Sequence, residues 1–477
     1  MQRERNEKAG TPGGDAVTGE EQEQPSLKRA IGPGLLLLFI VGDILGAGIY
    51  ALAGKVASEI GGIAWLPFVV AFGIAVLTAC SYLELVTKYP RAGGSAVYAQ
   101  RAFGIKFLTF LVGLMVMFSG LTSAAAGARA FAANLEGVLG VNPITIGLGI
   151  PLVALAFMVL LALINLRGVS ESVRLNVVLT LIELSGLLII ISIGVWALLH
   201  GTGNLSRLTQ VRVDEGETVL SALAAATALT FYTILGFEDA VNMVEETKNP
   251  LRTFPRIMLL GISITVTIYI LVVITAVTLV DPLNLGKGDA PLLDVVKAGA
   301  PHFPIGIFGV ISMFAVANTA LINMLMGSRL LYGMAEEGVL PAIFGRVGHR
   351  RQTPWVAIIL TTVLAFFLIA FADLRALAGT TSLLLLIVFM VTNISVLALR
   401  RRPAPHPHFR TPLVFPILGA LACGYLASPF SGRPLQEYVI AGYLLAGGIA
   451  LWILERMLAR VLRKAGHETM AEKDPTA

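Results

Sequence analysis

Long apolar runs recur along almost the whole chain, and each is long enough to cross a lipid bilayer. A helix of about 20 apolar residues spans the ~30 Å hydrocarbon core of a membrane. Hydrophobic residues make up 56% of the 477 residues and charged residues only 14%, whereas the surface of a soluble protein needs more charge. The sequence therefore predicts an all-α integral membrane protein embedded in a lipid bilayer.

Twelve of these runs are predicted to be transmembrane helices. Lys and Arg gather in alternate loops and near both ends of the chain, and basic loops of membrane proteins stay in the cytoplasm. We therefore expect a multi-pass protein of the cell (plasma) membrane with both termini cytoplasmic. The predicted helices cover residues 32–54, 62–86, 106–133, 145–166, 173–199, 219–243, 257–281, 303–334, 355–372, 376–400, 411–429 and 437–461.

The sequence carries no pattern typical of an enzyme or a nucleotide-driven pump. The six histidines fall in loops, helix ends or the C-terminal tail, and there is neither an HExxH motif nor a Cys/His cluster with metal-ligand spacing. The phosphate-binding motif G-x-x-x-x-G-K-[ST] is also absent. We expect no catalytic residue, metal, cofactor or nucleic acid partner, and we attribute the net charge of +5 to the basic loops.

Two predicted helices contain glycines and carboxylates where an unbroken span would carry neither. The first holds GDILGAGIY, from Gly42 to Tyr50, which includes Asp43; the sixth holds Gly236 at mid-span, followed closely by Glu238. Glycine costs about 1 kcal/mol relative to Ala inside a helix, and a charged Asp at bilayer depth costs roughly 2.5 kcal/mol or more. We expect both helices to be broken near the bilayer centre, although the GxxxG spacing in the first also suits close helix packing.

The two predicted breaks lie five helices apart, in helices that run in opposite directions. Paired glycine-interrupted spans of this kind indicate an inverted repeat whose binding site lies at the breaks. We therefore divide the chain into a disordered cytoplasmic tail (1–30), a ten-helix core with a five-plus-five inverted repeat (31–402), two additional helices (403–461) and a cytoplasmic C-terminal tail (462–477). The two additional helices are a candidate surface for a homodimer.

Four segments resemble the amino acid–polyamine–organocation permeases. GAGIY resembles the glycine-rich break of the first helix, and YPRAGGSAVYAQRAFG (89–104) resembles the loop after the second. GFEDAVNMVEETKNPLRTFPR (236–256) resembles the exit of the sixth helix, and SRLLYGMAEEGVLP (328–341) the end of the eighth. The resemblance covers nearly the whole chain. It implies the fold of the bacterial leucine transporter and amino acids or amines as substrates.

The predicted breaks supply a site for a zwitterion. If the first helix unwinds at its glycines, the N–H groups and positive dipole end of its outer half can bind a carboxylate. Free carbonyl groups at the end of the outer half of the sixth helix can accept hydrogen bonds from an ammonium group. The resemblance implies an aromatic cover over the substrate, and a hydroxyl of the third helix is a further candidate. The predicted substrate-binding residues are Gly46, Ala47, Gly48, Ile49, Ser119, Phe231, Ile234, Leu235 and Gly236.

Three acids lie deep in predicted spans, where a functional role is the default hypothesis. Asp43, Glu183 and Glu238 are therefore predicted to couple transport to a proton or sodium ion, or to contact the substrate. Sodium-independent members of the family can carry a lysine at mid-helix 5. Glu183 falls at or near that position, so this chain departs from the lysine mechanism.

The sequence favours a secondary active transporter that moves amino acids across the cell membrane by proton coupling. The alternative is an exchanger of cationic amino acids or polyamines, in which the deep acids bind a second positive charge of the substrate. A membrane enzyme would need a nucleophile or metal cluster in the spans, and a channel would need repeated polar or charged rings. Paired helix breaks fit one central site better than a pore.

Overall fold

The computed structural model describes residues 31–90, 94–139, 149–167, 172–213, 216, 218–244, 247–336, 340–348, 353–404 and 406–471. The predicted all-α class is confirmed, because helices and short turns form the regular structure of these residues, apart from two isolated β-bridges. The longer helices are α1 (Pro33–Ile44), α2 (Ala47–Ile60), α3 (Trp65–Lys88), α4 (Gly94–Phe103), α5 (Lys106–Leu139), α6 (Ile150–Arg167), α7 (Ser172–Leu199), α8 (Val219–Thr230), α9 (Pro250–Leu279), α10 (Pro282–Lys287), α11 (Pro291–Gly299), α12 (Ile305–Glu336), α13 (Trp355–Phe371), α14 (Leu374–Leu399), α15 (Val414–Ala427) and α16 (Leu435–Ala471). Short 3₁₀ helices are η1 (Leu205–Thr209), η2 (Phe231–Ile234), η3 (Asp239–Met243), η4 (Ala342–Gly345) and η5 (Pro429–Ser431).

Many of these helices have the length and composition of membrane spans. In the described part of the chain, eight are long and apolar enough to cross a membrane, counting Val219–Met243 as one. The pair α1 and α2, bent by 42° at a break, would make a ninth. The apolar helices α6, α13 and α15 are shorter. Each of the predicted apolar runs coincides with one of these segments.

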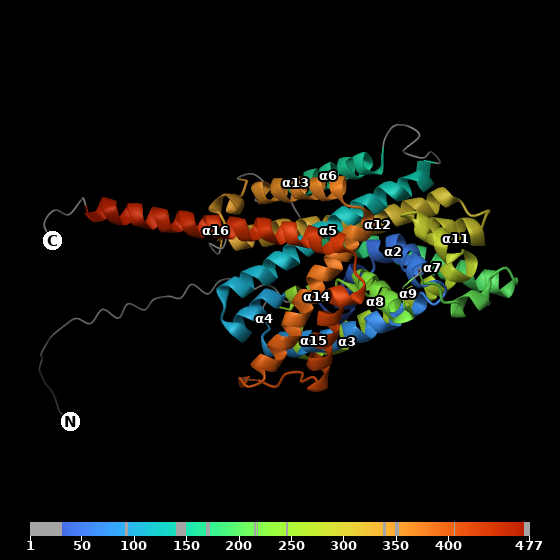
Figure 1. The fold of residues 1–477 in the computed structure, drawn as a ribbon, viewed down its shortest axis with the longest axis horizontal. Coiled ribbons are helices and arrows are strands. Elements are labelled where there is room, and N and C mark those ends of the chain that lie inside the picture. The colour runs from blue at the N-terminus through green and yellow to red at the C-terminus, as the bar shows by residue number, and fades with distance from the viewer. Residues whose placement is uncertain are drawn as a thin grey trace, which may run out of the picture.

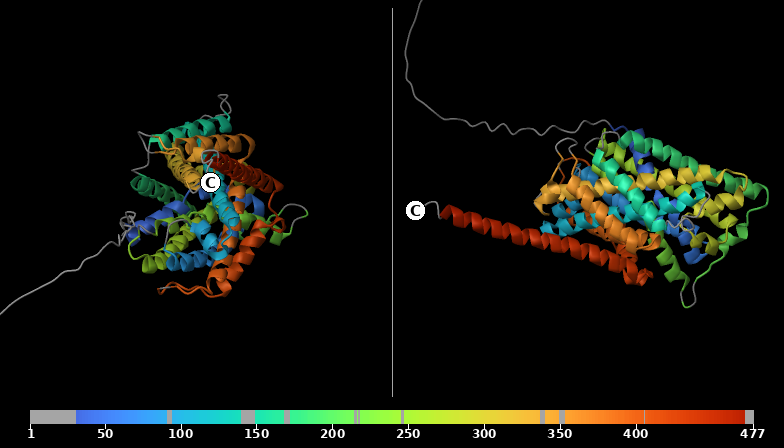
Figure 2. Two further views of the ribbon diagram at one scale, coloured as in Figure 1. Left: turned by 90° about the vertical axis from the view of Figure 1, so that its left-hand side faces the viewer. Right: turned by 90° about the horizontal axis from the view of Figure 1, so that it is seen from above.

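Three helices lie where the sequence analysis expected loops. Helix α4 occupies the segment between the second and third predicted spans, and α10 and α11 occupy the segment before the eighth. These helices are short and only partly apolar, so a search for long apolar runs does not find them. Helix α16 also continues to Ala471, beyond the predicted end at residue 461, and projects from the bundle as a long rod (Figures 1 and 2).

The bundle has two distinct ends (Figure 1). Helix α4 and the projecting part of α16 lie at one end, which we call the α4 end. Helix α11 lies at the other, which we call the α11 end. Local sequence fixes several helix starts: Thr218 and Ser221 form a capping box before α8, and the Asp373 carboxylate accepts the Ala376 N–H, 2.7 Å away, at the start of α14.

Helix α2 is fastened at the α11 end. A Cβ atom at Gly54 would lie 2.6 Å from the carbonyl carbon of Leu285, so only glycine permits the close approach of α2 and α10. The Lys55 ammonium donates to the carbonyl oxygen of Gly286 (2.8 Å) and pairs with the Asp289 carboxylate (3.2 Å). These contacts hold α10 and its following loop over α2.

A buried ion pair joins the last two helices to the rest of the bundle. The Arg433 guanidinium lies 2.6 Å from the Glu437 carboxylate, and the two side chains are only 2% and 4% exposed. The same guanidinium donates to the carbonyl oxygens of Leu426 in α15, Gly379 in α14 and Ala228 in α8. Because all its nitrogens have acceptors, the buried charge is compensated.

We predict that Arg433→Met destabilises the protein far more than Lys297→Met. The Lys297–Asp294 pair has similar helical spacing but side chains that are 61% and 43% exposed, so water already solvates both partners. Removing one member of a buried pair costs about 3–5 kcal/mol, whereas an exposed pair contributes about 0–1 kcal/mol. Thermal unfolding of the purified variants measures both effects. Equal, small shifts of the unfolding midpoint would contradict the stabilising role of the buried Arg433–Glu437 pair.

Candidate functional site

The first break lies between α1 and α2 and is shorter than the sequence suggested. Helix α1 ends at Ile44, Leu45 and Gly46 are extended, and Ala47 already begins α2. The hydroxyl of Thr319 in α12 accepts the Ala47 N–H at 3.1 Å. The Tyr269 hydroxyl in α9 donates to the carbonyl oxygen of Ile44 at 2.7 Å. Neighbouring side chains thus satisfy backbone groups that the break removes from the helix.

The second break follows α8. The chain leaves the α-helix at Thr230, makes the 3₁₀ turn η2 and becomes extended at Leu235. Gly236 has φ +120°, a value that residues with a side chain rarely adopt, and its N–H donates to the Glu238 carboxylate at 2.9 Å. The chain then continues as the 3₁₀ helix η3 and not as a second α-helix.

The two breaks touch each other. A Cβ atom at Gly236 would lie 2.7 Å from the carbonyl carbon of Asp43, next to the first break. A Cβ atom at Gly48 would lie 2.7 Å from the Cα atom of Thr233 in η2. Only glycine fits at these two positions, so the glycines bring the interrupted backbones of both helices into direct contact.

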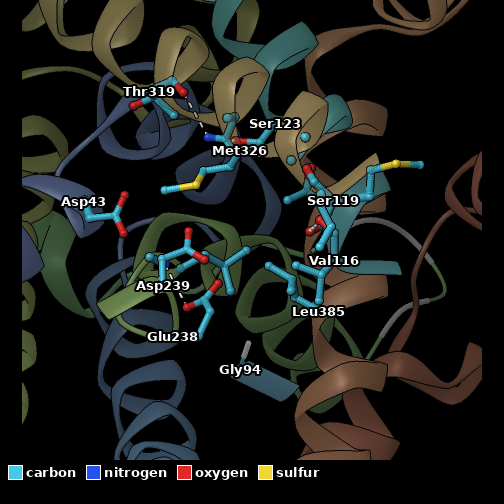
Figure 3. A pocket seen from close by; sticks show the side chains of 18 of the residues that line it. Asp43, Gly94, Val116, Ser119, Ser123, Glu238, Asp239, Thr319, Met326 and Leu385 are labelled. Carbon is cyan, nitrogen blue, oxygen red and sulfur yellow. Dashed lines mark hydrogen bonds between the residues drawn. The ribbon is translucent and has the colours of Figure 1, made fainter. Parts of the chain in front are cut away.

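A cavity of about 540 Å³ lies beside the touching breaks. Its lining includes many of the residues predicted from sequence. The predicted residues that line it are Asp43, Gly46, Ala47, Gly48, Ser119, Leu235, Gly236 and Glu238. Figure 3 shows Asp43, Glu238 and Asp239 on one side of this cavity and Ser119 and Leu385 on the other.

Four predicted residues are not among those that line the cavity. Ile49 and Ile234 are fully buried in the apolar core, and the ring of Phe231 packs edge-on against Phe389, with centroids 5.9 Å apart. Glu183 lies in α7, where the Tyr50 hydroxyl donates to its carbonyl oxygen at 2.6 Å. Neither carboxylate oxygen of Glu183 has a hydrogen-bond partner among the described residues.

Three carboxyl groups share the cavity, and the sequence analysis had selected two of them, Asp43 and Glu238. Asp239 lines the cavity together with Asp43 and Glu238 (Figure 3). In a regular helix, neighbouring side chains point about 100° apart, so a regular helix would turn Glu238 and Asp239 to different sides. The two adjacent carboxylates in the sequence could have indicated Asp239 as a site residue. Because the backbone is interrupted here, both side chains line the cavity.

Positive charge is scarce around these acids. Of the described residues that line the cavity, Arg329 is the one with a cationic side chain, and it is exposed. One carboxylate oxygen of Asp43 is buried and has no hydrogen-bond partner within the described ranges. The cavity therefore holds three carboxyl groups with little positive charge nearby, and a bound cation would compensate them in their ionised form.

A hydroxyl and amide network forms another part of the cavity wall. The Ser123 hydroxyl in α5 lies 3.2 Å from the Tyr232 hydroxyl in η2. The Asn323 amide in α12 donates to the carbonyl oxygen of Thr319 at 2.9 Å and to Ser123 at 3.4 Å. Sequence reasoning missed Ser123, Tyr232 and Asn323, because a single polar residue within an apolar run does not reveal which side of its helix faces the site.

The cavity extends from the breaks toward the α4 end. Its residues from α5 lie between Gly113 and Ser123, in the half of that helix nearer α4. Its residues from α12 lie between Thr319 and Leu330, from the middle of that helix toward its C-terminal end. Gly94, at the start of α4, also contributes. Helices α10 and α11 contribute none of the described lining residues.

Comparison with known proteins gives a consistent family match. A family described as amino acid permease matches residues 35–442. A mouse (Mus musculus) protein named cationic amino acid transporter 4 is 30% identical over 412 residues, which cover 81% of this chain and 62% of that protein. A vacuolar cationic amino acid transporter 4 of Arabidopsis thaliana is 30% identical over 76% of this chain and 62% of its own length.

A bacterial relative matches over almost its full length. The methylthioribose transporter of Bacillus subtilis is 25% identical over 456 residues, which cover 91% of this chain and 95% of that protein. By contrast, this chain spans only about three fifths of the animal and plant relatives named above.

We predict that Gly236→Ala lowers the free energy of unfolding, by roughly 1–3 kcal/mol for the positive φ alone, and prevents the contact between the breaks. Gly73→Ala is the matched control, because a Cβ atom at Gly73 in α3 meets nothing within 4 Å. Replacing a helical glycine by alanine is neutral or stabilising, by up to about 1 kcal/mol. Thermal unfolding compares the two variants, and a harmless Gly236→Ala would show that the breaks need no glycine there.

Proposed function

The chain belongs to the amino acid permease family, and on this premise we propose that it is a secondary active transporter of cationic amino acids. The observation that carries the proposal is the group of three carboxyls, Asp43, Glu238 and Asp239, at the contact of two broken helices. Two relatives named as cationic amino acid transporters support the choice of substrate. Among the alternatives raised by the sequence, this arrangement favours the cationic substrate.

The backbone at the breaks suits the zwitterionic part of such a substrate. The first turn of α2 offers N–H groups and the positive end of a helix dipole, and Gly46, Ala47 and Gly48 line the cavity. Because the Ala47 N–H is already donated to Thr319, the N–H groups that follow it are the candidates for the substrate carboxylate. Carbonyl groups near Leu235 are the candidates for the α-ammonium group.

The carboxyl cluster suits the second positive charge. A buried carboxylate is costly unless a cation or hydrogen-bond donors compensate it. Asp43 belongs to α1 and Asp239 to η3, and both line the cavity, so one guanidinium or ammonium group bound to both would engage both broken helices. A neutral amino acid would leave the cluster uncompensated.

We further propose twelve membrane spans, with the α4 end and both termini in the cytoplasm. The basic loops at the α4 end support this orientation, and the antiparallel broken helices support the five-plus-five inverted repeat. The cavity then faces the cytoplasm, while α10 covers the outer half of the first span. Opening to the outside requires the Lys55–Asp289 contact and the ion pair between Arg375 and Glu59 (2.5 Å) to separate.

Uptake by purified protein in liposomes tests the substrate. We predict that Asp239→Asn weakens the uptake of arginine and lysine by about tenfold or more, since a hydrogen bond to a charged group contributes roughly 1.5–3 kcal/mol. Any residual uptake of leucine should change less, because leucine has no second positive charge.

Asp294→Asn, at an exposed carboxylate of α11, is the matched control and should leave the uptake of all three amino acids unchanged. Equal losses for arginine and leucine in Asp239→Asn would make Asp239 a structural residue. A wild-type protein that prefers leucine would overturn the proposed substrate class.

We also propose that Glu183 couples transport to protons. It is fully buried, both its carboxylate oxygens lack a partner in the described structure, and the Tyr50 hydroxyl links its backbone to α2. A carboxyl group at this depth that neither lines the cavity nor pairs with a cation is a candidate proton carrier. Sodium remains the alternative coupling ion.

We predict that Glu183→Gln flattens the pH dependence of uptake, because the amide keeps the shape of the side chain but cannot release a proton. Uptake in liposomes is measured with an imposed inward proton gradient and, separately, with a sodium gradient. The Asp294→Asn protein again serves as the control. An unchanged pH profile would leave Glu183 with a structural role, and stimulation by sodium alone would replace the proton as the coupling ion.

A further inference from the structure

A second cavity lies apart from the transport site. It has a volume of about 200 Å³ and sits where α3 ends at Lys88 and α14 ends at Leu399, beside α4. We call it the basic pocket. Its charged and imidazole side chains are Glu84, Lys88, Arg400, Arg402, His408 and Arg410.

The charges of the basic pocket do not balance. Four cationic side chains line it, against the single carboxylate of Glu84. That carboxylate is already fully engaged: Arg400 donates to both its oxygens, at 3.1 and 2.8 Å, and the Thr411 N–H donates to it at 2.9 Å. The remaining cations therefore give the pocket a net positive charge.

Two of these cationic side chains have hydrogen-bond donors without an acceptor among the described residues. The Lys88 ammonium, on a residue only 4% exposed, donates to the carbonyl oxygens of Leu399 and Arg402, both at 2.7 Å. An ammonium group has three donors, so one is left. Arg410 has neither a hydrogen-bond acceptor nor an ion-pair partner within the part of the chain that the structure describes.

We propose that the basic pocket binds a phosphate group. Arginine and lysine side chains converging on one cavity match the several acceptor oxygens and the negative charge of phosphate. A neutral ligand would leave the excess positive charge in place. Pockets of this kind between transmembrane helices on the cytoplasmic side suit the head groups of anionic lipids.

The surroundings favour a lipid as the source of that phosphate. Just after Arg410, the chain begins α15, whose exposed apolar side chains Val414, Ile417 and Leu421 recur at helical spacing. A head group in the pocket would place its acyl chains beside this lipid-facing surface. A soluble phosphate anion offers the same chemistry without the acyl chains, and it is the second source to be tested.

A ligand in the basic pocket would also stabilise the cavity beside the two breaks, at the part of that cavity formed by α4. Arg402 donates to the carbonyl oxygen of Arg101 in α4 at 2.7 Å, so one wall of the pocket is fixed to that helix. The first residues of α4, Gly94 and Ser95, line the transport cavity. The Ser95 hydroxyl is hydrogen-bonded to Tyr82 of α3. The ligand would thus bridge α3, α14 and α4.

Thermal unfolding of the full-length protein in a zwitterionic detergent tests the proposal without any transport assay. Phosphatidylglycerol, phosphatidylcholine and inorganic phosphate are titrated separately at equal ionic strength. We expect phosphatidylglycerol to raise the unfolding midpoint and phosphatidylcholine to leave it unchanged. Arg410→Gln should weaken the apparent affinity for phosphatidylglycerol about fivefold, the effect of one basic residue near a membrane surface.

The matched control is Lys106→Gln, which removes an exposed positive charge from the start of α5, outside the pocket. Arg410 is chosen over Lys88 because it holds no backbone carbonyl, and the midpoint without lipid verifies that each variant folds. Stabilisation by inorganic phosphate alone would support the site and assign it to a soluble anion. Equal affinities for Arg410→Gln and Lys106→Gln, or no stabilisation by any phosphate-bearing ligand, would overturn the proposal.

Discussion

The direct contact between two interrupted helices is the constraint on which the rest of the site depends. Gly236 and Gly48 leave no room for a side chain where the breaks meet, and Gly236 also adopts a backbone conformation that favours glycine. Interrupted backbone inside a membrane protein must find hydrogen-bond partners or line a cavity. Both solutions occur here: Thr319 and Tyr269 bind backbone groups of the first break, and the cavity lies beside both.

The two ends of the bundle differ in how the helices pack around the cavity. Close packing and ion pairs at the α11 end hold α10 over α2, so the first span is covered on that side. Toward the α4 end, the cavity reaches the beginning of α4, whose other contacts include a wall of the basic pocket. A change in the packing of α4 would therefore affect both cavities, of which one is lined mainly by acidic and the other mainly by basic charged side chains.

Much of the fold could be predicted from sequence because apolar length is a strong signal: every predicted apolar run contains a helix. The glycine and carboxylate patterns also marked the two segments where helices are interrupted. Short helices such as α4 escaped detection, because their burial depends on packing and not on apolar length. Within the site, backbone positions were easier to predict than side chains. Ile49 and Ile234 belong to segments next to the breaks but are buried in the core, whereas Asp239 lines the cavity because the helix is interrupted before it.

The buried guanidinium of Arg433 has a mechanical consequence for the second broken helix. It binds the carbonyl oxygen of Ala228, in the last turns of α8, together with groups of α14 and α15. The part of this span before the break is thereby bound to α14 and α15, whereas η3, after the break, packs against α1 and α4. Leu235 and Gly236 therefore join two segments of one span that pack against different helices of the bundle.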